Sequence, residues 1–324
     1  MLTWYFKWVP TLPNRFTPKI EYDVIEEGTP KRQQVTMSML MYCIGNIDDC
    51  TKAIDPKGLP PPGSPLGKII NPATIRNASE NGTTLAMIVK NVGGGMSPPT
   101  KLSVLDAFRD IKTFTNYERM HKSFYWFKSI LLSDTAPLNA AGVDILLKWA
   151  ASTGLKSPPN TVFEIQSLGG AMKDVPREAT SSLLHDATHV LIMRIGLQQN
   201  SGPVYETAMA QLNNASRAQA DIVNTFPRKA ADFRSYVNFI DSDIALLSSD
   251  WEKAYYGASM QPLLCINEKF DPSFILDHAV YPLHNLLQDG PGVKASQCTG
   301  LVTPRAAAAQ KWSATLLKTA PLRL

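Results

Sequence analysis

The sequence is short of several features that define common functional classes. Its 324 residues contain no apolar run approaching the roughly 20 residues that a membrane-spanning helix needs. Lysine and arginine form no run that could follow a phosphate backbone, and the net charge of +4 is small. We therefore expect neither a membrane protein nor a nucleic-acid-binding protein.

Motifs that hold phosphates or direct export are also missing. Gly93-Gly94-Gly95 is not followed by a helix that starts with lysine and serine or threonine, so it predicts a turn and not a phosphate loop. The first residues lack the basic segment and apolar core of a signal peptide. As written, the chain is expected in the cytoplasm, or in the secretory route if a missing N-terminal region carries a signal.

Cysteine is scarce and forms no recognised pattern. The four positions are Cys43, Cys50, Cys265 and Cys298. Packed thiols are the favoured interpretation, and a disulfide between the first two is the alternative. Tripeptides at Asn77, Asn81 and Asn214 match the N-glycosylation acceptor pattern. Chance is favoured for these matches unless a missing N-terminal region directs the chain to export.

Histidine spacing gives no support to a metal site. His189 is expected to open a strand, and an extended backbone at about 3.3 Å per residue places it roughly 13 Å from His185. Two histidines four positions apart can bind the same metal ion when they lie on one face of a helix, and not when the backbone between them is extended. No serine or cysteine lies in a nucleophile elbow. We expect neither a metal centre nor a hydrolase.

The residues that are present predict a globular α+β protein. A hydrophobic content of 44% with 19% charged residues is ordinary for a sizeable core. β-Branched and aromatic stretches predict strands at 2–9, 34–45, 83–92, 124–132, 162–167 and 190–197. Helical spacing predicts helices at 103–113, from Asp134 or Thr135 to Gly154, and at 203–223, 251–256 and 259–269. Proline and glycine predict a loop at 55–82. The order favours a largely antiparallel sheet covered on one face by helices.

The most specific stretch lies between residues 233 and 276. In order, it contains Tyr236-x-Asn238-x-x-Asp241, Tyr255-Tyr256-Gly257 and Phe270-Asp271-Pro272. The first motif predicts a short extended piece, and Gly257 predicts a helix end. Together the three motifs resemble the C-terminal signature of the berberine-bridge-enzyme-like family of oxygen-dependent, FAD-linked oxidoreductases. The aromatic-Lys128-Ser129 strand and Gly169-Gly170-Ala171-Met172 resemble earlier parts of the same substrate domain.

The resemblance implies a two-domain flavoprotein that oxidises a small molecule, with members in natural-product pathways that include ergot-alkaloid ring closure. Substrate would give a hydride to FAD, and O₂ would reoxidise the cofactor. By this comparison residues 1–120 are a loop-rich remnant of the inter-domain region and first strands, 121–287 are the α+β substrate domain and 288–324 are a tail. The FAD-binding domain is then missing. We expect this chain alone not to retain FAD, and a separate FAD-binding domain is a candidate partner.

The resemblance also assigns candidate roles to individual residues. It implies a catalytic role for Tyr236 and flavin-side hydrogen bonds from the following residues: Asn238, Asp241, Tyr256 and Ser259. Structural alternatives stay open at these positions. Asn238 and Asp241 equally fit a hydrogen-bonded turn, and a buried tyrosine often only satisfies a carbonyl.

Three positions depart from the family pattern. Ile192 and Phe239 stand where members carry a carboxylate base and a phenol base, and neither side chain can take a proton. Ser259 replaces an asparagine with a shorter donor. We therefore expect a preserved frame around a weakened or altered site, without activity in this chain alone. The alternative is a flavin-independent cyclase or a ligand-binding protein that uses the same fold to position its ligand.

Overall fold

The structure is a computed structural model that describes residues 2–14, 16–27, 32–44, 85–92, 100–102, 124–154, 160–168, 172–176, 179–197, 203–228, 233–239, 241, 243–244 and 251–270. The chain divides into two compact units. The first comprises Met1–Met172 and Ala187–Asp241, and the second comprises Lys173–Asp186 and Ser242–Leu324. The boundaries expected near residues 120 and 287 stay a prediction.

The first unit is built on a seven-stranded sheet with the order β4-β3-β2-β1-β6-β7-β5. Its strands are β1 Phe16–Glu27, β2 Arg32–Ile44, β3 Leu85–Val92, β4 Thr100–Leu102, β5 Phe124–Leu132, β6 Asn160–Ser167 and β7 His189–Leu197. Each neighbouring pair is antiparallel. The α+β fold with an antiparallel sheet is therefore confirmed, as are the strands expected near β2, β3, β5, β6 and β7.

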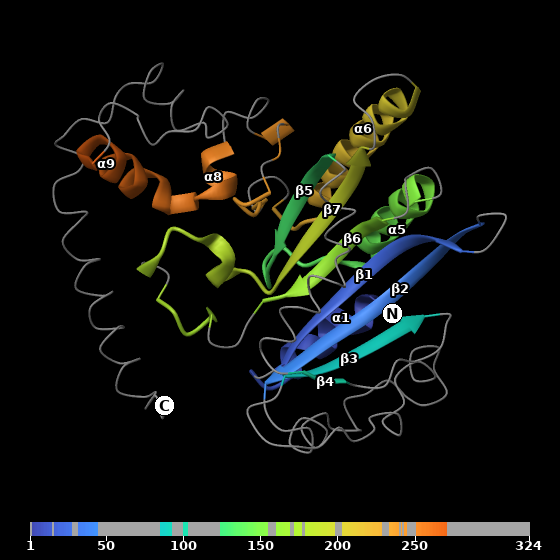
Figure 1. The fold of residues 1–324 in the computed structure, drawn as a ribbon. Coiled ribbons are helices and arrows are strands. Elements are labelled where there is room, and N and C mark those ends of the chain that lie inside the picture. The colour runs from blue at the N-terminus through green and yellow to red at the C-terminus, as the bar shows by residue number, and fades with distance from the viewer. Residues whose placement is uncertain are drawn as a thin grey trace. The chain divides into compact units, whose positions relative to one another are not determined.

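Three helices lie on one side of this sheet: α1 (Leu2–Trp8), α5 (Ala140–Gly154) and α6 (Pro203–Asn224). Figure 1 shows them behind the strands. Leu146 of α5 and Ile222 of α6 join Phe163 and Ile165 of β6 in one apolar cluster, and all four are 0% exposed. Burial of a large apolar side chain contributes about 1.5–3 kcal/mol, so this interface stabilises the unit.

The N-terminal residues form a helix, which shows that the strand expected at 2–9 was wrong. Leu2, Tyr5, Trp8 and Val9 are buried, at a spacing that fits one face of a helix. The Tyr5 hydroxyl lies 2.9 Å from the Pro18 carbonyl oxygen on β1. Aromatic content indicated burial correctly, but it does not distinguish a strand from a helix, whereas the spacing does.

Helix α5 begins later than Asp134 or Thr135, which were the expected caps. Asn139 takes this role, because its Oδ1 accepts a hydrogen bond from the Gly142 N–H at 3.0 Å. The earlier polar residues form their own turn, in which the Ser133 and Ala136 backbones exchange hydrogen bonds at 3.2 Å. The predicted end at Gly154 and the predicted helix corresponding to α6 are confirmed.

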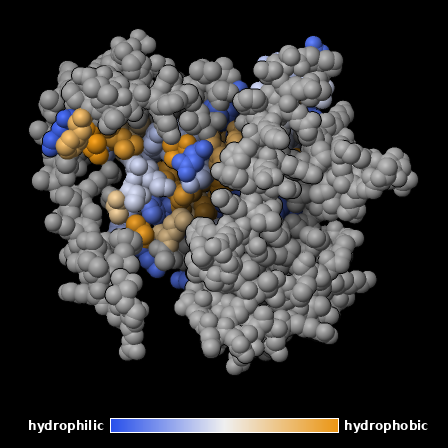
Figure 2. All heavy atoms as spheres, viewed as in Figure 1, coloured by the Kyte–Doolittle hydropathy of each residue, from blue (hydrophilic) through white to orange (hydrophobic). Residues whose placement is uncertain are grey.

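The second unit contains the 3-10 turn η5 (Leu183–Asp186), α8 (Trp251–Tyr255), the 3-10 turn η7 (Gly257–Ser259) and α9 (Met260–Phe270). The expected helix pair is confirmed, and Gly257 ends the first helix with φ at +54°. A Cβ there would lie 3.2 Å from a Leu183 methyl group. Orange atoms mark apolar side chains on the visible surface of α9 at the upper left of Figure 2, and Phe270 is 68% exposed.

Cys265 corrects the expectation of packed thiols. It is 2% exposed on α9 and is disulfide-bonded. Spacing alone does not give disulfide connectivity, which is why the sequence favoured the simpler state.

Several expectations lie outside the described residues. They are the loop at 55–82, the turn at Gly93, the helix at 103–113, the tail at 288–324, Cys50, Cys298, Asn77 and Asn81. Within the described part of the chain, no helix is long and apolar enough to cross a membrane. The same residues contain no group of three or more histidine, cysteine, aspartate or glutamate side chains that could hold a metal ion.

Candidate functional site

The two faces of the sheet in the first unit carry different side chains. Strand β6 alternates between the apolar core, which receives Phe163 and Ile165, and the opposite face, which receives Glu164 and Gln166. We call that opposite face the outer face. Strand register places Glu164 beside Ile192 of β7, so both belong to the outer face.

A row of outer-face residues crosses four neighbouring strands. Glu21 of β1 is opposite Glu164 of β6, which is opposite Ile192 of β7, which is opposite Ser129 of β5. Adjacent strands lie about 4.8 Å apart, so the row extends over roughly 14 Å. Its middle is shielded, since Ile192 is 1% exposed, and its ends carry the polar groups described next.

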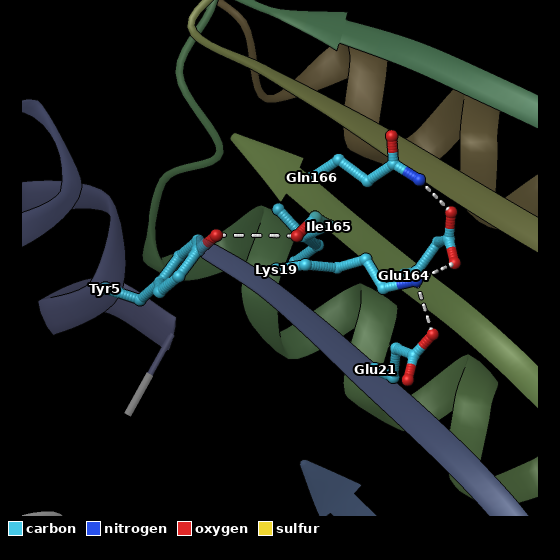
Figure 3. Close-up of polar contacts among 6 residues, drawn as sticks. All are labelled: Tyr5, Lys19, Glu21, Glu164, Ile165 and Gln166. Carbon is cyan, nitrogen blue, oxygen red and sulfur yellow. Dashed lines mark hydrogen bonds and ion pairs between the residues drawn. The ribbon is translucent and has the colours of Figure 1, made fainter. Parts of the chain in front are cut away.

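A charged network occupies the β1 and β6 end of this row, as Figure 3 shows. Lys19 Nζ lies 2.6 Å from Glu21 Oε1 and 3.2 Å from Glu164 Oε2. The Gln166 amide donates to the other Glu164 oxygen. Burial alone lowers the pKa of Lys19, but the charges of Glu164 and Glu21 outweigh it, and the pKa is raised. The ammonium is thus held protonated, and the network has one net negative charge.

The other end of the row meets the segment 233–239, which runs along the edge strand β5. The Leu131 N–H donates to the Arg234 carbonyl oxygen at 2.8 Å, and the Tyr236 N–H donates to Ser129 Oγ at 2.9 Å. The segment then turns, with the Phe239 N–H donating to the Tyr236 carbonyl at 2.9 Å. The extended piece expected from Tyr236 onward is therefore wrong, because side-chain and backbone hydrogen bonds close a turn there instead.

Aromatic side chains gather at this turn. The Phe239 ring centroid lies 5.0 Å from that of Phe127 and 5.4 Å from that of Tyr236. The Arg194 guanidinium carbon lies 5.6 Å from the Phe127 ring centroid, within cation–π range. The exposed Asn238 amide donates to the Tyr236 hydroxyl oxygen at 2.8 Å. Because this oxygen accepts, the Tyr236 hydroxyl hydrogen can be donated to a bound molecule.

Asp241 lies just after this segment and forms a buried ion pair. Its Oδ1 lies 2.8 Å from Lys128 Nζ, and the two side chains are 2% and 1% exposed. Lys128 is opposite Met193, so it starts from the core side of β5. Removing one member of such a pair leaves an uncompensated buried charge. Asp241 therefore fixes the end of the segment that carries Tyr236.

Three of the five candidate residues, Tyr236, Asn238 and Asp241, belong to the first unit. Asn238 contacts Tyr236, whereas Asp241 is paired with Lys128. The other two, Tyr256 and Ser259, belong to the second unit, where the Ser259 N–H donates to the Tyr256 carbonyl at 2.9 Å in η7. The catalytic role of Tyr236 and the roles of the other four residues toward a flavin stay a prediction.

Sequence reasoning missed the charged network. Lys19 and Glu21 lie in β1, a strand that the sequence did not predict. Glu164 lies in a strand that was recognised by its apolar residues, and no motif marks it. The usable signal is alternation, because Glu164 and Gln166 interrupt Phe163 and Ile165 with period two. Which strands are neighbours, and hence which charges meet, comes only from the sheet order.

A known protein family and several solved structures resemble this chain. A family model described as berberine and berberine like matches residues 235–278. Residues 235–278 are a berberine-like segment. The resemblance seen in the sequence is thereby confirmed. The segment includes the turn at Tyr236 and Asn238 and the buried Asp241. No curated protein sequence matches the chain.

Solved structures share the berberine-like fold. Berberine bridge enzyme from Eschscholzia californica superposes with a TM-score of 0.57 at 13% identity, over 85% of this chain and 51% of that chain. A variant of berberine bridge enzyme that is described as a reticuline dehydrogenase superposes with a TM-score of 0.57 at 14% identity, with the same coverage. Aclacinomycin oxidoreductase gives 0.50 at 15% identity, over 85% and 51%. This chain thus spans about half the length of these proteins, and the likeness establishes the fold.

The outer face offers groups that suit a flavin ring. An isoalloxazine needs a flat apolar contact and hydrogen-bonding partners at its edge, and Phe127, Phe239 and the Tyr236 hydroxyl supply both. Adenine and pyrophosphate need other groups, such as a glycine-rich turn before a helix. No such turn occurs among the described residues. The residues present fit the ring of FAD and not its adenylate part.

Proposed function

We propose that this chain is the substrate-binding part of an FAD-linked oxidoreductase that oxidises a small natural product, with O₂ as the final electron acceptor. The observation that carries the proposal is the berberine-like segment 235–278. Its first residues lie against β5 at the outer face, in a sheet with the fold of berberine bridge enzyme. Alkaloids are among the substrate classes to test first, because one solved relative is described as a reticuline dehydrogenase.

The outer face would bind and orient the substrate. Tyr236 donates its hydroxyl hydrogen to a substrate oxygen or nitrogen, while Asn238 holds that hydroxyl in place at 2.8 Å. Phe127 and Phe239 supply apolar contact to a ring system. The network around Lys19 gives the far end of the face one net negative charge, which favours a polar or cationic substituent there.

FAD would supply the oxidation by accepting a hydride from the substrate and passing the electrons on. This chain's part is to exclude water and to fix the reacting carbon near the cofactor. Groups for the adenylate would come from a separate FAD-binding domain, so we expect the purified chain to be free of retained flavin. Ile192 and Phe239 cannot take a proton, and Tyr236 acts as a hydrogen-bond donor, so water is left to accept a proton from the substrate.

Flavin binding to the purified chain tests this proposal. Riboflavin, which has the ring without adenylate, is titrated in and its fluorescence quenching is measured, and FAD is titrated in parallel. We expect weak binding of both at similar affinity. Tyr236→Phe removes one hydrogen bond of about 1 kcal/mol, which weakens riboflavin binding about five-fold. Tyr205→Phe, on α6, is the matched control and leaves binding unchanged.

Two results would change the account. Visible flavin absorbance in a stoichiometric amount after purification contradicts the expectation that the chain does not retain FAD. Absence of riboflavin binding contradicts the role of the outer face. In that case a flavin-independent cyclase or a ligand-binding protein of the same fold becomes the better candidate.

A further inference from the structure

Helix α6 carries an acceptor tripeptide for N-linked sugar on its solvent side. Its core side is formed by Ala215, Ala218 and Ile222, which are buried against the sheet. Asn214 precedes the first of these and is exposed. With Ser216 it completes the Asn-x-Ser acceptor pattern, which N-glycosylation requires at a surface position. An oligosaccharide on Asn214 would extend into solvent without disturbing the core.

The disulfide at Cys265 is an independent sign that the chain passes through the compartment in which N-linked sugar is attached. Disulfides persist in oxidising environments and are rare where glutathione keeps thiols reduced. Cys265 lies 2% exposed on α9 and is disulfide-bonded. N-linked glycosylation and disulfide formation take place in the same oxidising compartment of a eukaryotic cell. The two observations come from different elements and from different chemistry.

We propose that Asn214 is an N-glycosylation site and that this protein matures in an oxidising secretory compartment. In the reaction, a bond forms between Asn214 Nδ2 and the first sugar carbon of a lipid-linked oligosaccharide diphosphate. The bond from that carbon to the diphosphate oxygen breaks, the lipid diphosphate leaves, and Nδ2 loses one proton. The proposal concerns maturation and does not depend on the proposed oxidoreductase function.

The order of events follows from the helix. In the folded chain Ser216 Oγ donates to the Leu212 carbonyl oxygen at 3.0 Å, so the hydroxyl needed for recognition is engaged by the backbone. Transfer therefore precedes the formation of α6, while the chain is still extended. Because α6 covers the helical side of the sheet, the sugar stays away from the outer face, where we propose that substrate binds.

The direct test is mass spectrometry of the protein purified from its natural source. After enzymatic removal of N-linked sugar in heavy-oxygen water, trypsin releases residues 195–217, which contain Asn214. We expect Asn214 to be converted to aspartate with heavy oxygen, and Cys265 to react with a maleimide only after reduction. An unconverted Asn214, or a Cys265 that reacts without reduction, would overturn the proposal.

Variants secreted from a eukaryotic host locate the site. Asn214→Gln and Ser216→Ala should each migrate faster on an electrophoresis gel than the unaltered protein, by the one mobility step that an attached sugar causes. Asn213→Gln and Ser216→Thr should keep it, since Asn213 is an exposed neighbour outside the pattern and threonine preserves it. Loss of the step in Asn213→Gln, or its retention in Asn214→Gln, would place the sugar elsewhere and contradict the assignment. The peptide analysis of unaltered protein does not require any variant to fold.

Discussion

The two faces of the sheet in the first unit differ although they are made by the same strands. On β6, Phe163 and Ile165 enter the apolar core and are 0% exposed, while Glu164 between them joins a charged network on the outer face. The core face follows from hydrophobic burial, which is non-directional and tolerant of the choice of residue. The outer face depends on specific atoms meeting at hydrogen-bonding distance. The core face therefore determines the fold, and the outer face is where a chemical function is to be expected.

Two lysines in the middle of strands sharpen this contrast. Lys19 lies on the outer face and is shared between two carboxylates, with 22% of its side chain exposed. Lys128 starts from the core side of β5 and is 1% exposed, with Asp241 as its ion-pair partner. A partly exposed network tolerates the loss of one member, because water can replace it. A buried pair does not.

The largest expected effect is at the buried pair. Asp241→Ala should lower the free energy of unfolding by about 3–5 kcal/mol, because Lys128 would be left as a buried unpaired charge. Urea denaturation measures the loss. Combining Asp241→Leu with Lys128→Met should restore much of the stability. Asp144→Ala is the control, since its exposed pair with Lys148 contributes about 0.2–0.5 kcal/mol.

The next test compares a core-face residue, Phe163, with Tyr236 at the outer face. Phe163→Ala should cost about 3–5 kcal/mol through lost burial and a cavity in the core. Because the residue is on the core face, riboflavin affinity of the fraction that remains folded should not change. Equal loss of affinity in Phe163→Ala and Tyr236→Phe would remove the distinction between the faces.

A smaller effect on stability is expected within the charged network. Glu164→Gln removes a charged partner from Lys19 and should cost about 1.5–3 kcal/mol, toward the lower value because Lys19 is partly exposed. Glu21→Gln should cost less, since Lys19 keeps Glu164. Both are read from urea midpoints. A larger loss for Glu21→Gln would show that the order of importance is the reverse.

The smallest expected effect is a loss of stability that is confined to alkaline pH and is absent near neutral pH. The pKa of Lys19 is raised above its ordinary 10.5, so its stabilising contribution is complete below that value and is lost as the pH rises through the folded pKa. Burial raises the pKa of Tyr5 and of Tyr22 above 10.0, so above that pH the unfolded chain ionises first and is favoured. Unfolding midpoints measured at increasing pH should fall above pH 10, with no such fall between neutral pH and that point. Tyr22→Phe should reduce the slope.

The fold was more accessible to sequence reasoning than the site. Five strands and the helices corresponding to α6, α8 and α9 follow from periodicity and from turn residues such as Gly257, because local rules govern them. The N-terminal helix was missed because aromatic residues such as Tyr5 and Trp8 favour strands, whereas burial of one helical face decides the structure there. Propensity is a weak guide where one buried face decides the structure.

The site required knowledge of which strands are neighbours. Tyr236, Asn238 and Asp241 were found through a motif that is local in sequence. Their partners come from distant elements, as in the contacts of Asp241 with Lys128 and of Tyr236 with Ser129. No spacing rule connects such positions, since sheet order and register bring them together. The same holds for Glu164 and Lys19, which are separated by 145 positions.

We expect ligands to bind to the outer face, and isoleucine methyl NMR tests this most directly. Ile192 lies on the outer face, whereas Ile130 and Ile165 lie in the core on the helical side. On titration with riboflavin, we expect the Ile192 methyl signal to shift with ligand concentration and the signals of Ile130 and Ile165 to stay in place. Shifts confined to Ile130 and Ile165, with Ile192 unchanged, would contradict the account.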